Sequence, residues 1–182
     1  MVPPIYQVST YKQDGVGGLR GGYEYSRSAN PTRTALETAL ASAEGGDAGF
    51  AFASGLAAED TLLRAVLRPG DHVVLGNDAY GGTYRLIARV FGPWGIETTA
   101  VDLTDLDAVA AAVEPGRTKV VWTETPTNPL LGVVDIAALS AAARAAGAVL
   151  VVDNTFATPY LQQPLALGAE VVVHSTTKYI GG

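Results

Sequence analysis

The chain contains no cysteine, and this absence excludes disulfides, thiolate metal sites and cysteine nucleophiles. Long apolar runs are also missing: the longest stretches, such as residues 148–152, are far too short for a bilayer, which takes ~20 residues. The N-terminus, Met1-Val2-Pro3-Pro4, lacks the basic segment and apolar run of a secretion signal. We therefore expect a cytoplasmic protein that makes no membrane contact.

Basic residues are scarce as well. Lys and Arg number 12 against 18 Asp and Glu, which gives a formal net charge of −6. Nucleic acid is disfavoured as a partner, because its phosphates need clusters of Lys and Arg. Apolar residues make up 48% of the 182 residues and charged residues 16%, a composition typical of a globular domain with a real core.

Strand-like and helix-like segments alternate from residue 30 onward. We expect strands at 49–54, 72–75, 96–101, 118–123, 148–153 and 171–174, and helices at 31–44, 56–67, 84–91, 106–113 and 136–146. Continuous apolar strands separated by helices predict an α/β fold, with a mainly parallel sheet and helices on both faces. Ligands of such sheets bind outside the carboxyl ends of the strands.

A lysine and several hydroxyls follow the last of these strands. Lys178 closes the segment His174-Ser175-Thr176-Thr177-Lys178, which comes directly after three valines. A lysine at a strand end can form an imine with an aldehyde where its pKa is lowered, and the hydroxyls of Ser175 and Thr177 can bond phosphate oxygens. The alternative is a solvated lysine after a turn rich in Ser and Thr.

Asp153 ends an almost wholly apolar strand. A carboxylate there is expensive to bury unless a positive group meets it. A protonated pyridine nitrogen would meet this need and would keep the ring an electron sink. A helix N-cap or a magnesium ligand is an equal alternative for Asp153 taken alone.

Two Gly-containing turns could approach a ligand closely. At Ser54-Gly55-Leu56, free N–H groups at a helix start would bind phosphate, although any tight turn between strand and helix can use Ser-Gly. At Tyr80-Gly81-Gly82, glycines next to an aromatic let a flat ligand approach the backbone while the ring stacks on it. A turn with one surface tyrosine is the alternative.

Near the N-terminus, Tyr25 and Arg27 offer a hydroxyl and a planar fork suited to phosphate, although a flexible surface loop has the same composition. Taken together, the sequence places phosphate donors, a stacking aromatic, a partner for a ring nitrogen and an imine-forming lysine in one chain. A nucleotide-binding α/β domain is disfavoured because G-x-G-x-x-G and P-loop motifs are both absent.

These residues give the chain a specific resemblance. It resembles the Cys/Met-metabolism family of pyridoxal-phosphate enzymes at residues 25–33, 54–58, 124–129, 152–155 and 175–179. The resemblance implies the aspartate-aminotransferase-like fold (fold type I) in a longer chain, so we expect an N-terminal fragment. Residues 1–30 would form an arm that contacts a neighbouring subunit, and residues 31–182 a partial pyridoxal-phosphate-binding domain.

The resemblance also implies a role for each candidate residue. Lys178 would hold pyridoxal phosphate covalently and later move protons, while Asp153 would pair with the pyridine nitrogen. Tyr80 would stack on the ring and shuttle a proton, and Asn128 would contact the ring hydroxyl. The phosphate would be held by Gly55, Leu56, Ser175 and Thr177. Tyr25 and Arg27 would reach the phosphate of a neighbouring subunit, which implies a homo-oligomer, a tetramer.

Within the family, the resemblance favours a cystathionine γ-synthase, which replaces the acyl group of O-acylhomoserine by cysteine in methionine biosynthesis. Glu24 stands where cystathionine-handling members carry an acidic residue, which can pair with the distal amino group of cystathionine; loop solvation is its alternative role. Gly82 replaces the cysteine usual in methionine γ-lyases. The alternatives are a cystathionine γ-lyase, which forms cysteine, 2-oxobutyrate and ammonia, and a cofactor-binding fragment without activity.

Overall fold

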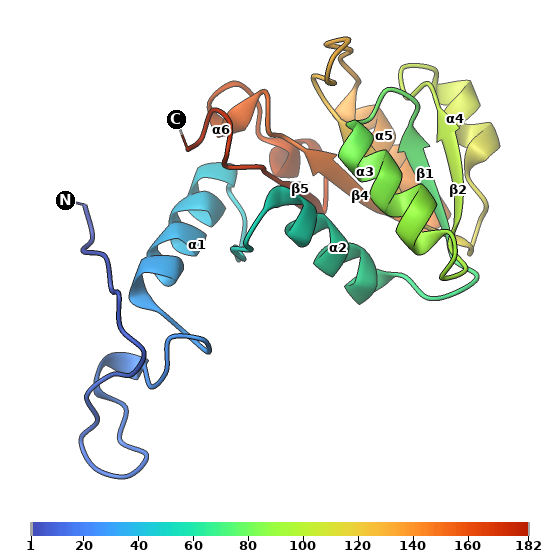
Figure 1. The fold of residues 1–182 in the computed structure, drawn as a ribbon. Helices are drawn as coiled ribbons and strands as arrows, with labels where there is room; N and C mark the ends of the chain where they lie inside the picture. The colour runs from blue at the N-terminus through green and yellow to red at the C-terminus, as the bar shows by residue number, and fades with distance from the viewer. Residues whose placement is uncertain (1, 182) are drawn as a thin grey trace. The chain divides into compact units, whose positions relative to one another are not determined.

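The computed structural model describes residues 2–181, which divide between Ala51 and Phe52 into two compact units. The first unit contains a short 3-10 helix, η1 (Arg20–Gly22), and one long helix, α1 (Pro31–Glu44) (Figure 1). The Asn30 side chain caps α1 by accepting a hydrogen bond from the N–H of Thr32 at 2.9 Å. Gly45 ends the helix at φ 71°, so the predicted helix at 31–44 is confirmed.

The second unit is built on a five-stranded sheet in which every pair of neighbours is parallel. Across the sheet, the strands follow the order β2 (Glu97–Val101), β1 (His72–Gly76), β3 (Thr118–Glu124), β4 (Val149–Asp153) and β5 (Val171–Val173). Because all strands run the same way, their carboxyl ends meet at one edge. The predicted mainly parallel sheet is confirmed.

Helices cover both faces of this sheet, as the sequence predicted (Figure 1). Side chains alternate along each strand: Val73 and Trp122 pack under α2 (Gly55–Val66) and the π-helical segment η2 (Leu86–Phe91). Val74 and Val121 face the opposite side, against α4 (Leu106–Ala112) and α5 (Ile136–Ala146). The remaining short elements are α3 (Gly81–Arg85), α6 (Thr158–Leu161) and η3 (Pro164–Leu167).

Two expectations need correction. Residues 49–54 were expected to form a strand, but they adopt no strand, and Phe50 and Phe52 are 75% and 43% exposed. An apolar run becomes a strand only when a neighbour accepts its backbone hydrogen bonds, and no described strand pairs with this run. The helix expected at 84–91 begins earlier, at Gly81, because the two glycines of the turn are part of α3.

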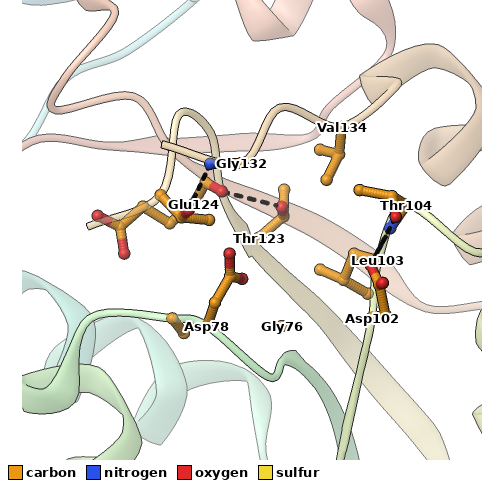
Figure 2. Close-up of a pocket in the computed structure, with 11 residues that line it drawn as sticks. Gly76, Asp78, Asp102, Leu103, Thr104, Thr123, Glu124, Gly132 and Val134 are labelled. Carbon is orange, nitrogen blue, oxygen red and sulfur yellow. Dashed lines mark hydrogen bonds between the residues drawn. The ribbon is translucent and has the colours of Figure 1, made fainter. Parts of the chain in front are cut away.

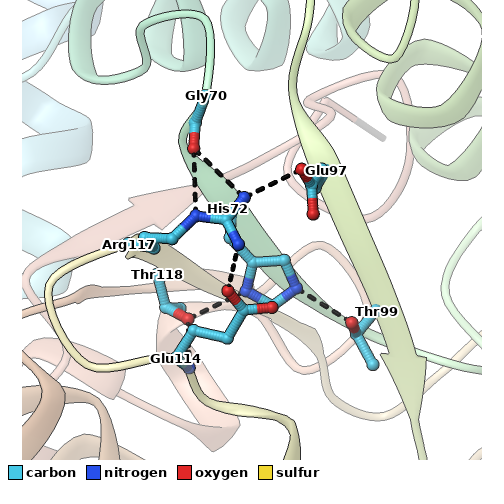
Figure 3. A network of polar contacts seen from close by, with 7 residues as sticks. All are labelled: Gly70, His72, Glu97, Thr99, Glu114, Arg117 and Thr118. Carbon is cyan, nitrogen blue, oxygen red and sulfur yellow. Dashed lines mark hydrogen bonds and ion pairs between the residues drawn. The ribbon is translucent and has the colours of Figure 1, made fainter.

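A polar network closes the opposite edge of the sheet, where the strands begin (Figure 3). The buried His72 ring has Nδ1 2.8 Å from Thr118 Oγ1 and Nε2 2.9 Å from Thr99 Oγ1. Arg117 forms ion pairs with Glu97 and Glu114 over this ring. Burial lowers the pKa of His72, and Arg117 lowers it further against the opposing effect of the two carboxylates. The ring is therefore neutral at physiological pH.

No helix in residues 2–181 combines the length and the apolar character needed to cross a membrane.

Candidate functional site

Polar side chains gather where the parallel strands end. Glu124 and Asp153 are the last residues of β3 and β4, and they are register partners across the sheet. Ser175 follows β5 after a single intervening residue. Because β3, β4 and β5 are successive neighbours, this arrangement brings carboxylates and a hydroxyl to one edge of the sheet, where ligands of such folds bind.

The start of α2 lies against the loop that follows β5. Ser54 caps the helix, and its Oγ accepts a hydrogen bond from Ala57 N at 3.1 Å. The N–H groups of Gly55 and Leu56 belong to the first turn, where a helix leaves donors without an internal partner. A Cβ on Gly55 would lie only 3.0 Å from Ser175 Cβ, so the absence of a side chain permits this approach. Backbone donors and a hydroxyl together form a cradle that fits a phosphate group.

Asp153 is buried, with 8% of its surface exposed. Burial raises the pKa of Asp153, while hydrogen bonds from Thr155 and the positive charges of His174 and Lys178 lower it. One of those bonds runs from Thr155 N to Asp153 Oδ1 at 3.0 Å. The Thr155 hydroxyl also accepts a bond from Ser175 N at 2.9 Å, which ties the aspartate loop to the cradle. A buried carboxylate held in this way suits a protonated ring nitrogen.

Lys178 lies in the turn after β5. Its Nζ donates to Ser175 Oγ at 3.1 Å, and the side chain is exposed. Thr177, in the same turn, is also exposed. The structure therefore brings Lys178, Ser175, Asp153 and Gly55 together, as the sequence suggested from their positions after strands.

Tyr80 and Asn128 lie on two further loops at the same edge. Tyr80 precedes α3, and its ring lies so close to Gly82 that a Cβ there would be 2.3 Å from Tyr80 Cε1. Asn128 belongs to a loop closed by two hydrogen bonds between Thr127 and Gly132, at 2.8 and 3.0 Å. The peptide bonds Thr125-Pro126 and Asn128-Pro129 in this loop are both cis.

Two buried carboxyls lie in the site: Glu124 belongs to the stretch 124–129 that carried the family resemblance but was given no role of its own, and Glu59 was not predicted. Glu124 and Glu59 are 6% and 4% exposed, and the pKa of each is raised to about 7. Burial is the main cause for both, and the nearby charge of Asp153 contributes in the same direction. Glu124 carried the same signal as Asp153, an acid at the end of an apolar strand. Glu59 could have been found from its helical spacing, which places it on the buried face of α2 beside Leu63.

A small pocket opens beside Glu124 (Figure 2). It is lined by Asp78 after β1, by Asp102 and Thr104 after β2, and by Gly132 of the Asn128 loop. Its volume of about 20 Å³ is enough for one water molecule. Residues 2–181 contain no group of three or more His, Asp or Glu side chains arranged to hold a metal ion.

The three N-terminal candidates belong to the first unit. The Arg27 guanidinium lies 5.0 Å from the centre of the Tyr25 ring, and Tyr25 is 37% exposed. Glu24 is exposed, and its backbone oxygen accepts a bond from Tyr11 N at 3.1 Å. The roles predicted for these residues concern a neighbouring subunit or the substrate, and they stay predictions.

Comparison with known proteins identifies the family. The family model described as "Cys/Met metabolism PLP-dependent enzyme" matches residues 1–182. The chain belongs to this family. Its members depend on pyridoxal phosphate, the cofactor to which the cradle, Asp153 and Lys178 are suited.

Named relatives within the family differ in activity. A protein of Mycobacterium tuberculosis named cystathionine gamma-synthase is 62% identical over 179 residues, which cover 98% of this chain and 46% of that protein. A Bacillus subtilis protein named cystathionine gamma-lyase is 55% identical over the same length, with the same shares covered. The chain thus spans about half the length of these relatives.

A solved structure supports the fold assignment. The crystal structure of metB from Corynebacterium glutamicum superimposes with a TM-score of 0.96 at 57% identity, covering 100% of this chain and 47% of that one. The parallel sheet described above is therefore part of the fold of these pyridoxal-phosphate enzymes, as the resemblance implied.

Proposed function

We propose that the full-length protein containing this chain is a cystathionine γ-synthase, which joins O-acylhomoserine and cysteine with the help of pyridoxal phosphate. The observation that supports it most is the group formed by Asp153, Ser175, Lys178 and the start of α2. A phosphate cradle, a buried carboxylate and a lysine lie at one edge of the sheet, and they match the phosphate, the ring nitrogen and the aldehyde of this cofactor.

Each residue then has a defined task. The bound cofactor supplies an electron sink for negative charge at the substrate α-carbon. Asp153 keeps the proton on the ring nitrogen, because a buried carboxylate favours a cation next to it. Lys178 Nζ removes and returns protons at the α- and β-carbons, and its bond to Ser175 Oγ at 3.1 Å sets its starting position.

The phosphate is held by the N–H groups of Gly55 and Leu56 and by the hydroxyls of Ser175 and Thr177. Tyr80 stacks on the ring and shuttles a proton, and Asn128 contacts the ring hydroxyl. In this proposal Tyr25 and Arg27 reach the phosphate of a neighbouring subunit, and the full-length protein is a homotetramer that works in the cytoplasm.

The choice of γ-replacement is supported by the higher identity to the synthase, 62% against 55% for the lyase. We propose that Glu24 pairs with the distal amino group of cystathionine. Gly82 supports the exclusion of methionine γ-lyase activity, because a cysteine there would collide with the Tyr80 ring in the position it now has. Cystathionine γ-lyase is the second candidate, because the chain is nearly as similar to that enzyme and the early proton transfers are shared.

Product analysis separates the candidates. The full-length protein is incubated with pyridoxal phosphate, O-acylhomoserine and cysteine, and cystathionine is measured by mass spectrometry; in a second reaction cystathionine is the only substrate. We expect cystathionine to form in the first reaction much faster than 2-oxobutyrate forms in the second. The reverse order assigns the γ-lyase, and no product in either reaction refutes both. The Lys178→Ala variant is the matched control and forms neither product.

A further inference from the structure

Glu124 occupies the centre of the strand-end site, although nothing so far gives it a role. It ends β3 between the two neighbouring strand ends, where Asp153 is its register partner on β4 and Asp78 follows β1. Only 6% of its surface is exposed. A carboxylate is costly to bury at such a position unless hydrogen-bond donors meet it.

The main donor comes from the loop before α3. The backbone N–H of Tyr80 donates to Glu124 Oε2 at 2.7 Å, across 44 positions in the sequence. The backbone N–H of Asn128 has a weaker effect on the same carboxylate, whose pKa it lowers as that of Tyr80 does. Glu124 thus interacts with the backbone of Tyr80, which is expected to stack on the cofactor ring, and of Asn128, which is expected to contact the ring hydroxyl. It also lies beside Asp153 in the sheet.

The loop of Tyr80 needs this support. Tyr80 occupies the N-cap position of α3, but its own side chain makes no capping bond. α3 is only five residues long before it continues as η2, so its start has little cooperative stability of its own. The Glu124 carboxylate supplies from β3 the acceptor that a local cap would normally provide.

We propose that Glu124 is a positioning residue that fixes the backbone of Tyr80 and Asn128 against the cofactor ring, and that it does so in its ionised form. The positioning role rests on the proposed function, because it concerns the cofactor ring. The hydrogen bond from Tyr80 N to Glu124 Oε2 does not depend on any cofactor.

The ionised form is favoured as the pH rises through neutrality. Burial, together with the charges of Asp153 and Asp78 on either side, raises the pKa of Glu124 to about 7, although the backbone N–H groups of Tyr80 and Asn128 act to lower it. Below this pKa, one carboxyl oxygen carries a proton and accepts N–H bonds poorly. A cationic ring nitrogen next to Asp153 would favour the ionised form. By linkage, cofactor affinity rises with pH across this range.

The first experiment needs no cofactor. Amide hydrogen exchange at Tyr80 and Asn128 is measured in the full-length apoprotein and in Glu124→Gln. Glu170→Gln is the matched control, because Glu170 also accepts a backbone N–H bond, from Leu150 at 2.9 Å, but does so where β4 begins, at the opposite edge of the sheet. We expect exchange at both amides to become roughly tenfold faster in Glu124→Gln and to stay unchanged in Glu170→Gln. Unchanged exchange in Glu124→Gln would overturn the proposal.

Should Glu124→Gln fail to fold, Glu124→Asp takes its place. This variant keeps the charge, but its oxygens lie one CH2 group nearer to the strand and miss the loops. We expect the same loss of protection at Tyr80 and Asn128, and protection equal to that of the wild type would count against the proposal.

The second experiment measures the dissociation constant of pyridoxal phosphate and the visible absorption of the holoprotein from pH 6 to 8. We expect the wild type to bind more tightly as pH rises through about 7, and Glu124→Gln to bind roughly tenfold more weakly without that pH step. Equal affinity at every pH overturns the positioning role. If the wild type binds no cofactor, the proposed function fails, whereas the exchange result still decides the role of Glu124 in the fold.

Discussion

Replacing Gly55 by alanine adds a methyl group between the start of α2 and the loop after β5. The new Cβ would lie 3.0 Å from Ser175 Cβ and 3.3 Å from Ser175 Cα, whereas ordinary contact begins at 3.4 Å. One of these partners is backbone, so it cannot rotate away. The helix start and the loop must therefore separate by a few tenths of an ångström.

Both folding and binding are affected. Overpacking costs about 1–3 kcal/mol, and the better helix propensity of alanine offsets up to about 1 kcal/mol, so the free energy of unfolding falls by at most about 3 kcal/mol. Phosphate binding weakens as well, because both sides of the cradle are displaced. Hydrogen bonds to a charged group contribute about 1.5–3 kcal/mol each, and weakening one or two of them lowers cofactor affinity roughly 10–100-fold.

The assay is a titration of the full-length apoprotein with pyridoxal phosphate, followed by absorbance. Thr61→Ala is the control, because Thr61 is exposed on the same helix and its hydroxyl only donates to Ala57 O at 2.8 Å. We expect the control to bind like the wild type. If Gly55→Ala also keeps wild-type affinity, the start of α2 is not part of the phosphate cradle.

Three further predictions concern other parts of the second unit. Asp153→Asn removes the charge that holds the ring-nitrogen proton, so kcat should fall at least ~100-fold while the protein still folds, as checked by steady-state kinetics and circular dichroism. Gly82→Ala pushes the Tyr80 ring off its position, since a Cβ would lie 2.3 Å from it, and should alter the absorption of the bound cofactor; an unchanged spectrum would contradict this. Burial lowers the pKa of His72, so as the pH falls the unfolded chain takes up a proton on this ring before the folded protein does. The thermal midpoint should therefore drop below pH ~6.5, and it should drop less in His72→Gln. Equal drops in the two proteins would refute this prediction.

The sequence predicted those parts of the molecule that depend on local chemistry. Asn30 and Pro31 start a helix wherever they precede a helical pattern, and Gly45 ends it, so α1 was placed correctly. The continuous apolar residues of β4 and β5 predicted parallel strands, and Asp153 at the end of such a strand predicted a functional carboxylate. In each case the neighbours in sequence determine the outcome.

Other features depend on contacts between distant segments and could not be predicted. The bond from Tyr80 N to Glu124 joins the loop after β1 to the end of β3, and their distance follows only from the order of these strands in the sheet. The same is true of the ring of His72 between Thr99 and Thr118. Residues 49–54 have the apolar character of a strand, but whether they form one depends on a partner that composition does not reveal.

The central claim is that Lys178 holds pyridoxal phosphate. The full-length protein is incubated with the cofactor, reduced with borohydride and digested, and the pyridoxyl group is located by peptide mass spectrometry. We predict a single modified peptide with the adduct on Lys178, and none in Lys178→Ala. A folded, cofactor-saturated protein in which Lys178 remains unmodified would contradict the assignment of this strand-end site as the cofactor site of a pyridoxal-phosphate enzyme.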